Sequence, residues 1–212
     1  MSVSATQDET WSADLRVSGH AKCLDMSRCF GSWRLGVLAL AAGSLAFLTP
    51  SLSAAQESSG NLELRTTAFR PGGNIPKPFT CDGGDASPAL SWSDPPPRTQ
   101  SLVLIMDDPD APGGTFVHWV VYNLPASTRQ LPERLPGNDE MQGGGNQGVN
   151  DFARTSYGGP CPPPGKPHRY FFRLYALDSK LNLKGAARRK DVDQAMKGHV
   201  LAHAELMGLY GR

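Results

Sequence analysis

Alternating and continuous apolar segments divide the chain beyond residue 61 into short strands. Apolar and polar residues alternate over 62–66, which predicts a strand with one buried face. Longer segments rich in β-branched and aromatic residues predict stronger strands, and turns rich in Gly and Pro separate them. The expected strands cover 62–66, 78–81, 90–92, 101–106, 116–122 and 169–177.

The hydrophobic period changes near the C-terminus. From Val192 to Met207, apolar residues and histidines recur every three or four positions, which is typical of a helix. Asp191 is a suitable N-cap and Gly208 a suitable end. We expect one amphipathic helix packed on a mostly-β domain, that is, an antiparallel sheet or sandwich with a C-terminal helix.

The N-terminal part has the features of a secretory signal. Arg28 and Arg34 precede an apolar segment at 35–48, and the small residues Ser53 and Ala55 follow it. The alternative is a membrane anchor, but the apolar segment is shorter than the ~20 residues that a spanning helix needs. The pattern therefore favours a cleaved signal.

Cleavage is expected before Gln56. The predicted organisation is an N-terminal lead and signal peptide at 1–55, a polar leader at 56–61 and one domain at 62–212. The exported domain would be periplasmic or secreted, with no stable membrane insertion after cleavage. A net charge of +1 provides no electrostatic reason to expect nucleic acid as a partner.

The cysteines are consistent with export. Cys23 and Cys29 would leave with the signal, and Cys81 and Cys161 would remain. In an oxidising compartment a lone pair is expected to form a disulfide. Two buried free thiols are the alternative. A metal site is less favoured because neither cysteine belongs to a C-x-x-C pair, and we expect no metal and no cofactor.

Two histidines, a tyrosine and an aspartate fall on strands or at strand ends. By period two, His118 shares a face with Phe116 and Val120. His168 and Tyr170 share a face of the 169–177 strand region.

Asp108 follows the 101–106 strand at its end, beside a loop rich in Pro and Gly. Such loops at strand ends are where β-folds place ligand sites.

This set suits an anion such as phosphate. Imidazolium and tyrosine O–H groups donate to anionic oxygens, and the amides of Gly158 and Gly159 would add a nest for the same charge. Asp108 would hold one histidine in a fixed tautomer. An ordinary structural interpretation stays open on spacing alone: a strand histidine bonded to a carbonyl, a core tyrosine and an aspartate that caps its own turn.

Several motifs in the same order resemble the phosphatidylethanolamine-binding protein family, also called Raf kinase inhibitor-like proteins. The two signature regions are DPDAP at 108–112 with HWVVYNLP at 118–125, and YGGPCPP at 157–163 with HRY at 168–170. The bacterial branch in particular is resembled by FTCDG at 79–83, SP at 87–88 and GLYGR at 208–212.

The resemblance implies two antiparallel sheets with a C-terminal helix and a pocket for phosphate or a phosphorylated head group. The family's pocket residues fall on Asp108, His118, His168 and Tyr170. The proline at the rim of the pocket falls within 160–163, and we assign it to Pro160.

Gly159 joins the predicted ligand set, and Asp110 is expected to be structural, bonding loop amides. Val117 stands where the eukaryotic branch has a tryptophan and a second histidine, so kinase inhibition is not carried over.

The leading hypothesis is an exported, non-catalytic binding protein for a small anionic or phosphorylated ligand. The alternative is an inhibitor or interaction module with a protease or another protein as its partner, using the long surface loops. A hydrolase built on His118 and Asp108 is disfavoured because the chain has no G-x-S-x-G elbow and no complete metal-ligand pattern. No residue is therefore predicted to be catalytic.

Overall fold

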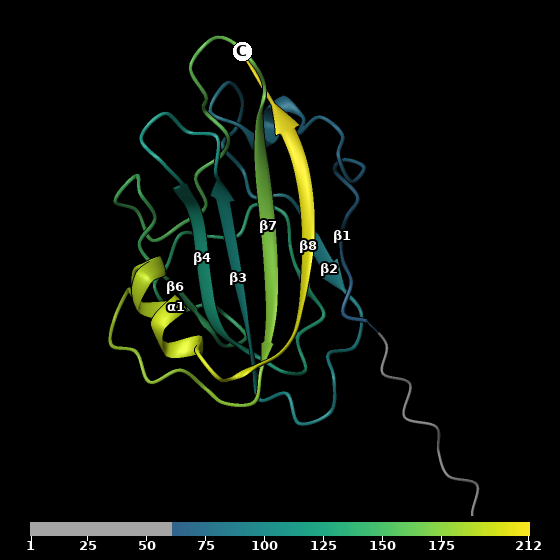
Figure 1. Cartoon of the computed structure of the whole chain (residues 1–212), viewed down its shortest axis with the longest axis vertical. Coiled ribbons are helices and arrows are strands. Elements are labelled where there is room, and N and C mark those ends of the chain that lie inside the picture. The colour runs from purple at the N-terminus through teal and green to yellow at the C-terminus, as the bar shows by residue number, and fades with distance from the viewer. Residues whose placement is uncertain (1–60) are drawn as a thin grey trace, which may run out of the picture. The chain divides into compact units, whose positions relative to one another are not determined.

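The computed structural model describes residues 61–212, whose strands form two antiparallel sheets (Figure 1). The large sheet has five strands. In spatial order they are β6 (Asn146–Gln147), β4 (Phe116–Pro125), β3 (Ser101–Asp108), β7 (His168–Leu177) and β8 (Val200–Tyr210). Every residue of the central strand β3 is buried, because both faces of the sheet are covered.

The small sheet covers one face of the large sheet. Its strands are β1 (Leu64–Thr66), β2 (Leu90–Trp92) and β5 (Gln130–Leu131), in that order. Leu104 and Met106 of β3 belong to the same core cluster as the buried residues of this small sheet. The alternate β3 residues, Val103 and Ile105, belong to a second core cluster on the opposite face.

The single α-helix in the described range, α1 (Arg189–Met196), covers that opposite face. Its buried residues Val192 and Met196 pack in the second core cluster with Val103 and Ile105. The predicted fold class, two antiparallel sheets with one helix, is confirmed. Strands also form where the apolar segments at 90–92, 101–106, 116–122 and 169–177 predict them.

The predicted strand at 78–81 is wrong. A 3₁₀ turn, η1 (Lys77–Phe79), lies there instead, with Pro76 and Pro78 restricting the backbone. The amide and the hydroxyl of Thr80 both donate to the Lys77 carbonyl, at 3.0 and 2.9 Å. The chain therefore folds back on itself at this point instead of extending.

The long C-terminal helix is also wrong in its extent. The helix ends at Met196, and Gly198 at a φ of 81° turns the chain into β8. Arg188 is the N-cap, whereas Asp191 is the third helical residue. Gly208 lies inside β8, so it ends no helix.

β8 pairs with β7 over most of its length. The three- and four-residue spacing of apolar residues from 200 to 207 also fits period two through Ala204 and Leu206, and only the pairing with β7 decides between the two. His203, expected on the apolar face of the helix, lies on this strand with its side chain exposed.

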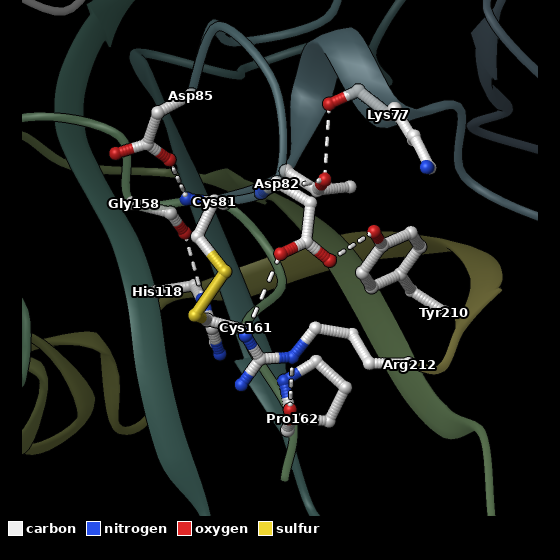
Figure 2. Close-up of a disulfide and its surroundings, with 12 residues drawn as sticks. Lys77, Cys81, Asp82, Asp85, His118, Gly158, Cys161, Pro162, Tyr210 and Arg212 are labelled. Carbon is white, nitrogen blue, oxygen red and sulfur yellow. Dashed lines mark hydrogen bonds and ion pairs between the residues drawn. A yellow bond between two sulfur atoms is a disulfide. The ribbon is translucent and has the colours of Figure 1, made fainter. Parts of the chain in front are cut away.

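The disulfide between Cys81 and Cys161 is present, with the two Cα atoms 5.4 Å apart (Figure 2). It joins the loop after η1 to the connection that precedes β7. The prediction of a disulfide is confirmed over the alternatives of free thiols and a metal site. The predicted signal at 1–55 and the leader up to residue 60 lie outside the described residues. Within 61–212, no helix is long and apolar enough to cross a membrane.

Candidate functional site

A β-bulge in β4 sets the direction of His118. In the pairing of β3 with β4, Met106 lies opposite Trp119 while Asp107 lies opposite Val117. β4 therefore has one residue more than β3 between these pairs, and that residue is His118. Bulges of this kind redirect a side chain and increase the local twist of the strand.

The bulge overturns one expectation from strict alternation. Val117 and Val120 both pack in the core cluster on the helix side, whereas Trp119 packs on the side of the small sheet. The His118 ring lies 5.2 Å from the ring of Tyr170, which belongs to the small-sheet side. The prediction that His118 shares its face with Val120 is therefore wrong.

His118 is buried and held in one tautomer. Its Nδ1 lies 2.7 Å from the carbonyl oxygen of Gly158, and because a carbonyl only accepts, Nδ1 carries the proton. Burial lowers the pKa of His118, and the Gly158 carbonyl opposes that shift. The neutral ring therefore has Nε2 left over as a hydrogen-bond acceptor.

Asp108 and His168 bring the end of β3 to the start of β7. The Asp108 Oδ2 atom lies 2.8 Å from Nδ1 of His168, and both side chains are largely buried. The Asp108 Oδ1 atom accepts the backbone N–H of Asp110 at 2.8 Å. Both carboxylate oxygens are thus engaged, and His168, like His118, has its Nε2 left over.

Tyr170 supplies a buried donor without a partner. Its side chain is fully buried, and its hydroxyl has no hydrogen-bond partner among residues 61–212. Burial, together with the nearby Asp108 carboxylate, raises the pKa of Tyr170. The hydroxyl therefore keeps its proton and is a donor. A buried polar group normally has a partner, and a water or another molecule in the cavity would supply one for this hydroxyl.

These side chains meet at a cavity of about 190 Å³. The structure brings together the four predicted pocket residues Asp108, His118, His168 and Tyr170 at this cavity. The other residues that line it are Ala111, Pro112, Phe116, Phe152, Cys161, Pro162 and Pro163. A larger cavity of about 290 Å³ lies beside β5, but Glu140 is the one charged residue among those lining it.

Pro160, predicted to lie at the rim of the cavity, has another role. Pro160 does not line the cavity, and its carbonyl accepts the N–H of Cys81 at 3.1 Å. The rim prolines are Pro162 and Pro163 instead. This assignment was wrong because a run of prolines in the sequence does not show which ring turns inward.

The predicted anion nest at Gly158 and Gly159 is also wrong. The Gly158 N–H donates to the carbonyl of His118 at 3.0 Å. The Gly159 N–H donates to Oδ1 of Asp85 at 2.6 Å. Since both amides already have protein acceptors, neither is free for a ligand.

Asp110 ties the loop after β3 to the start of β7. Its carboxylate accepts the backbone N–H of Arg169 at 2.9 Å and the guanidinium of the same residue at 2.7 and 2.9 Å. The guanidinium of Arg169 lowers the pKa of Asp110 to about 2. Asp110 therefore holds a strand amide, where an amide of its own loop was expected.

Aromatic rings form one wall of the cavity, and one of them, Phe152, was missed by the sequence patterns. The Phe116 ring lies 4.8 Å from the Phe152 ring, and Phe152 lies 5.4 Å from the His118 ring. Phe152 lies in an irregular connection where no period applies. Its place in the fold depends on Asn150, a fully buried side chain whose Oδ1 accepts the N–H of Phe152 and whose Nδ2 donates to the His118 carbonyl.

Most of the polar groups at the cavity are already bonded to other protein groups. No group of three or more His, Cys, Asp or Glu side chains within 61–212 is arranged to hold a metal ion. The single carboxylate at the cavity, Asp108, is already bonded to His168 and to an amide. The polar groups left over are two imidazole Nε2 atoms and one phenolic O–H.

Comparison with known proteins defines the class. A family model described as phosphatidylethanolamine-binding protein matches residues 65–211. A UPF0098 protein of Aquifex aeolicus is 53% identical over 153 residues, which cover 71% of this chain and 89% of that protein. A UPF0098 protein of Methanothermobacter thermautotrophicus is 50% identical over 151 residues, covering 71% and 99%.

Solved structures agree with this assignment. A putative phosphatidylethanolamine-binding protein homolog from Chlamydia trachomatis is 40% identical with a TM-score of 0.66, and the match covers 73% of this chain and 99% of that one. YbcL of E. coli, described as a member of the mammalian PEBP family, is 32% identical with a TM-score of 0.67, covering 72% and 99%. The chain belongs to the phosphatidylethanolamine-binding protein family.

Proposed function

We propose that this protein is an exported binding protein without turnover, whose cavity takes phosphate or the phosphorylated head group of a larger molecule. The observation that carries the proposal is the buried Tyr170 hydroxyl, which has no partner within 61–212 and lies at a cavity lined by two histidines. A buried donor without a partner is costly, and an anionic oxygen would satisfy it.

The size and the charge of the cavity support a small anionic group. Its volume of about 190 Å³ lies below the ~300–1,000 Å³ of pockets that hold drug-sized ligands. The Asp108 carboxylate would repel an anion, but His168 and the Asp110 amide already occupy its two oxygens. The phosphate moiety would bind inside, and the remainder of a larger ligand would stay outside.

Anion binding is expected to be linked to proton uptake. Because Nδ1 of His118 donates to Gly158, its Nε2 becomes a donor only when the ring is protonated. Asp108 likewise engages Nδ1 of His168 and leaves its Nε2 without a protein partner in 61–212. A bound anion would favour the protonated ring of His118, so affinity should increase as the pH falls.

The residues that line the cavity support binding without turnover, and the disulfide and the N-terminal segments support export. Among the described residues that line the cavity there is no serine or threonine hydroxyl, and Cys161 is in a disulfide, so a nucleophile of the Ser, Thr or Cys type is missing there. The disulfide suits an oxidising compartment. The basic and apolar segments before Gln56 would direct the chain there.

The test is calorimetric titration of the purified protein with phosphate, phosphoethanolamine and sulfate at pH 6 and pH 8. Sulfate does not titrate in this range, so its pH dependence reports on the protein. We expect binding that is tighter at pH 6 and is lost in His118→Ala. An Asp94→Ala variant, which removes an exposed ion pair with Arg129, should bind as the wild type does.

Other outcomes would redirect the proposal. No heat with any of the three anions would contradict it and favour an interaction module with a protein partner. Turnover of a phosphoester that disappears in His118→Ala would show an enzyme instead. A binding heat that is unchanged in His118→Ala would place the anion at some other site.

A further inference from the structure

Asp85 does not line the cavity, but it bonds two residues of the segment that packs on His118. It belongs to the loop after η1, and its carboxylate contacts the connection between β6 and β7 through two different residues. Figure 2 shows the Asp85 carboxylate on one side of Gly158 and the His118 ring on the other. No sequence motif pointed to this residue as part of the site.

The first contact acts through a single peptide plane. The Asp85 Oδ1 atom accepts the Gly159 N–H at 2.6 Å, and the Gly158 carbonyl accepts the His118 Nδ1–H at 2.7 Å (Figure 2). That N–H and that carbonyl belong to the same peptide bond, which is planar and trans, so they point in opposite directions. By fixing the N–H, Asp85 aims the carbonyl at His118.

The same hydrogen bond also strengthens its neighbour. A carboxylate that accepts from a peptide N–H polarises the peptide, which makes the carbonyl at its other end a better acceptor. The Gly158 carbonyl is the contact that assigns the proton to Nδ1 of His118. The negative charge of Asp85 therefore favours the tautomer in which Nε2 is left over.

The second contact supports the aromatic wall. The Asp85 Oδ2 atom lies 3.3 Å from both terminal nitrogens of Arg154. The Arg154 guanidinium lies over the Phe152 ring, 5.1 Å from its centroid, and Phe152 packs on His118. One carboxylate thus holds the partner of Nδ1 and, through Arg154, the ring that packs on the imidazole.

The contact requires glycine at position 159. A Cβ there would lie 2.8 Å from Asp85 Oδ1 and 2.6 Å from the Phe79 carbonyl, too close for any other residue. Gly159, expected to bind the ligand, is needed instead so that the carboxylate can approach the backbone. Asp85 itself has a φ of 49°, which Asp, Asn and Gly tolerate better than other residues do.

We infer that Asp85 is a positioning residue, which fixes the tautomer of His118 and thereby contributes to the pH dependence of anion binding. The carboxylates of Asp108 and Asp151 also act on the His118 ring through their charges, and the Tyr170 ring lies 5.2 Å from it. The inference rests on the proposed function for its effect on affinity. Its effect on the His118 ring can be measured with or without a ligand. An experiment can therefore contradict the role of Asp85 without contradicting the proposed function, and the reverse.

The experiment compares Asp85→Gly and Asp85→Asn with the wild type, since both variants suit the backbone at this position. Asp85→Gly removes both contacts, while Asp85→Asn keeps an acceptor for the Gly159 N–H and loses the charge. Nitrogen NMR of histidine-labelled protein reports the tautomer of His118, and calorimetry with sulfate from pH 5.5 to 8 reports affinity. Asp94→Ala again serves as the control, because it removes an exposed carboxylate that pairs with Arg129.

We expect the wild type to show Nδ1–H only and Asp85→Gly to show a mixture with Nε2–H. Its sulfate affinity should fall about tenfold, the size of one lost charge-assisted hydrogen bond, and its pH profile should shift. Asp85→Asn should show a smaller change in tautomer and affinity in the same direction. If Asp85→Gly does not fold, Asp85→Asn alone tests the inference. Unchanged His118 spectra and pH profiles in the folded variants would overturn the inference. If the wild type binds no anion, the proposed function fails, and the His118 spectra still test Asp85.

Discussion

Asp107 and Asp108 are neighbours on β3, yet they serve opposite faces of the large sheet. Asp107 points to the helix side, where it forms ion pairs with Arg189 of α1 and Arg173 of β7. Asp108 points to the cavity, where it bonds His168 and the amide of Asp110. Both side chains are almost fully buried.

The difference lies in the partners. Arginine keeps its charge at any physiological pH, so the ion pairs of Asp107 connect the sheet to the helix at every physiological pH. A histidine bonded through Nδ1 retains a second nitrogen, so the Asp108 pair leaves a polar group facing a cavity. The same residue type in adjacent positions thus stabilises the fold on one face and prepares a site on the other.

The largest expected effect is on stability at the cavity side. Replacing both Cys81 and Cys161 by serine removes a crosslink between residues 80 positions apart, which should lower the free energy of unfolding by about 4–5 kcal/mol. Urea unfolding of the variant and of the oxidised wild type measures this. Since Cys161 also lines the cavity, a smaller loss of anion affinity should accompany it. Equal stability of the two proteins would contradict the prediction.

The direct test of the comparison is the pair Asp107→Asn and Asp108→Asn. Asp107→Asn leaves two half-buried arginines without their common partner and should cost about 2–3 kcal/mol of stability. It should leave phosphate affinity unchanged. Asp108→Asn should also lower the stability, because Asp108 is buried and bonded to His168 and to the Asp110 amide. Unlike Asp107→Asn, it should weaken phosphate binding about tenfold, because the His168 ring loses the carboxylate that orients it toward the cavity. Equal losses of affinity in the two variants would show that the faces are not separate.

Tyr170→Phe should separate function from stability within one residue. The hydroxyl is buried without a partner in 61–212, so its removal should raise the free energy of unfolding by about 1 kcal/mol and weaken anion binding about tenfold. The matched control is Tyr210→Phe, whose hydroxyl donates to Asp82 at 2.6 Å. That variant should lose stability and keep its affinity. A Tyr170→Phe protein that is less stable than the wild type would mean that the hydroxyl has a partner.

The smallest effect expected is a pH dependence of stability through His118. Burial lowers its pKa in the folded state, so the folded protein binds this proton less readily than the unfolded chain does. The contribution is fully present above the unfolded pKa of about 6.5 and is lost as the pH falls through the lower folded value. Thermal unfolding from pH 7.5 to 5 should show this loss in the wild type and less of it in His118→Ala. Saturating sulfate should offset it.

The strands of the large sheet were predictable because burial leaves a local pattern. All of Ser101–Asp108 is buried, and its apolar run is visible in the sequence. The segment Val200–Tyr210 was not predictable in the same way, because its apolar positions fit both a helix and a strand. Pairing with β7, which is more than twenty residues earlier in the chain, decided in favour of the strand.

For the candidate site, residue identity was predictable and orientation was not. Asp108, His118, His168 and Tyr170 were named from strand ends and motifs, and the fold brings them together at one cavity. The contacts that support them were missed. Phe152 and Asp85 lie in irregular segments where neither period applies, so no local signal marks them.

The sequence by itself determined the fold class, the disulfide partners and the chemical types at the site. These follow from hydrophobic period, cysteine count and motif order, which are local or compositional properties. Only the tertiary structure decided which ring nitrogen of His118 and of His168 has no hydrogen bond to the described protein. Those hydrogen bonds join His118 to Gly158 and His168 to Asp108, 40 and 60 residues apart, and they depend on the β4 bulge and the strand register. The tertiary structure therefore determines which donors and acceptors a ligand meets. A hydrogen bond between residues so far apart leaves no pattern in the neighbouring sequence.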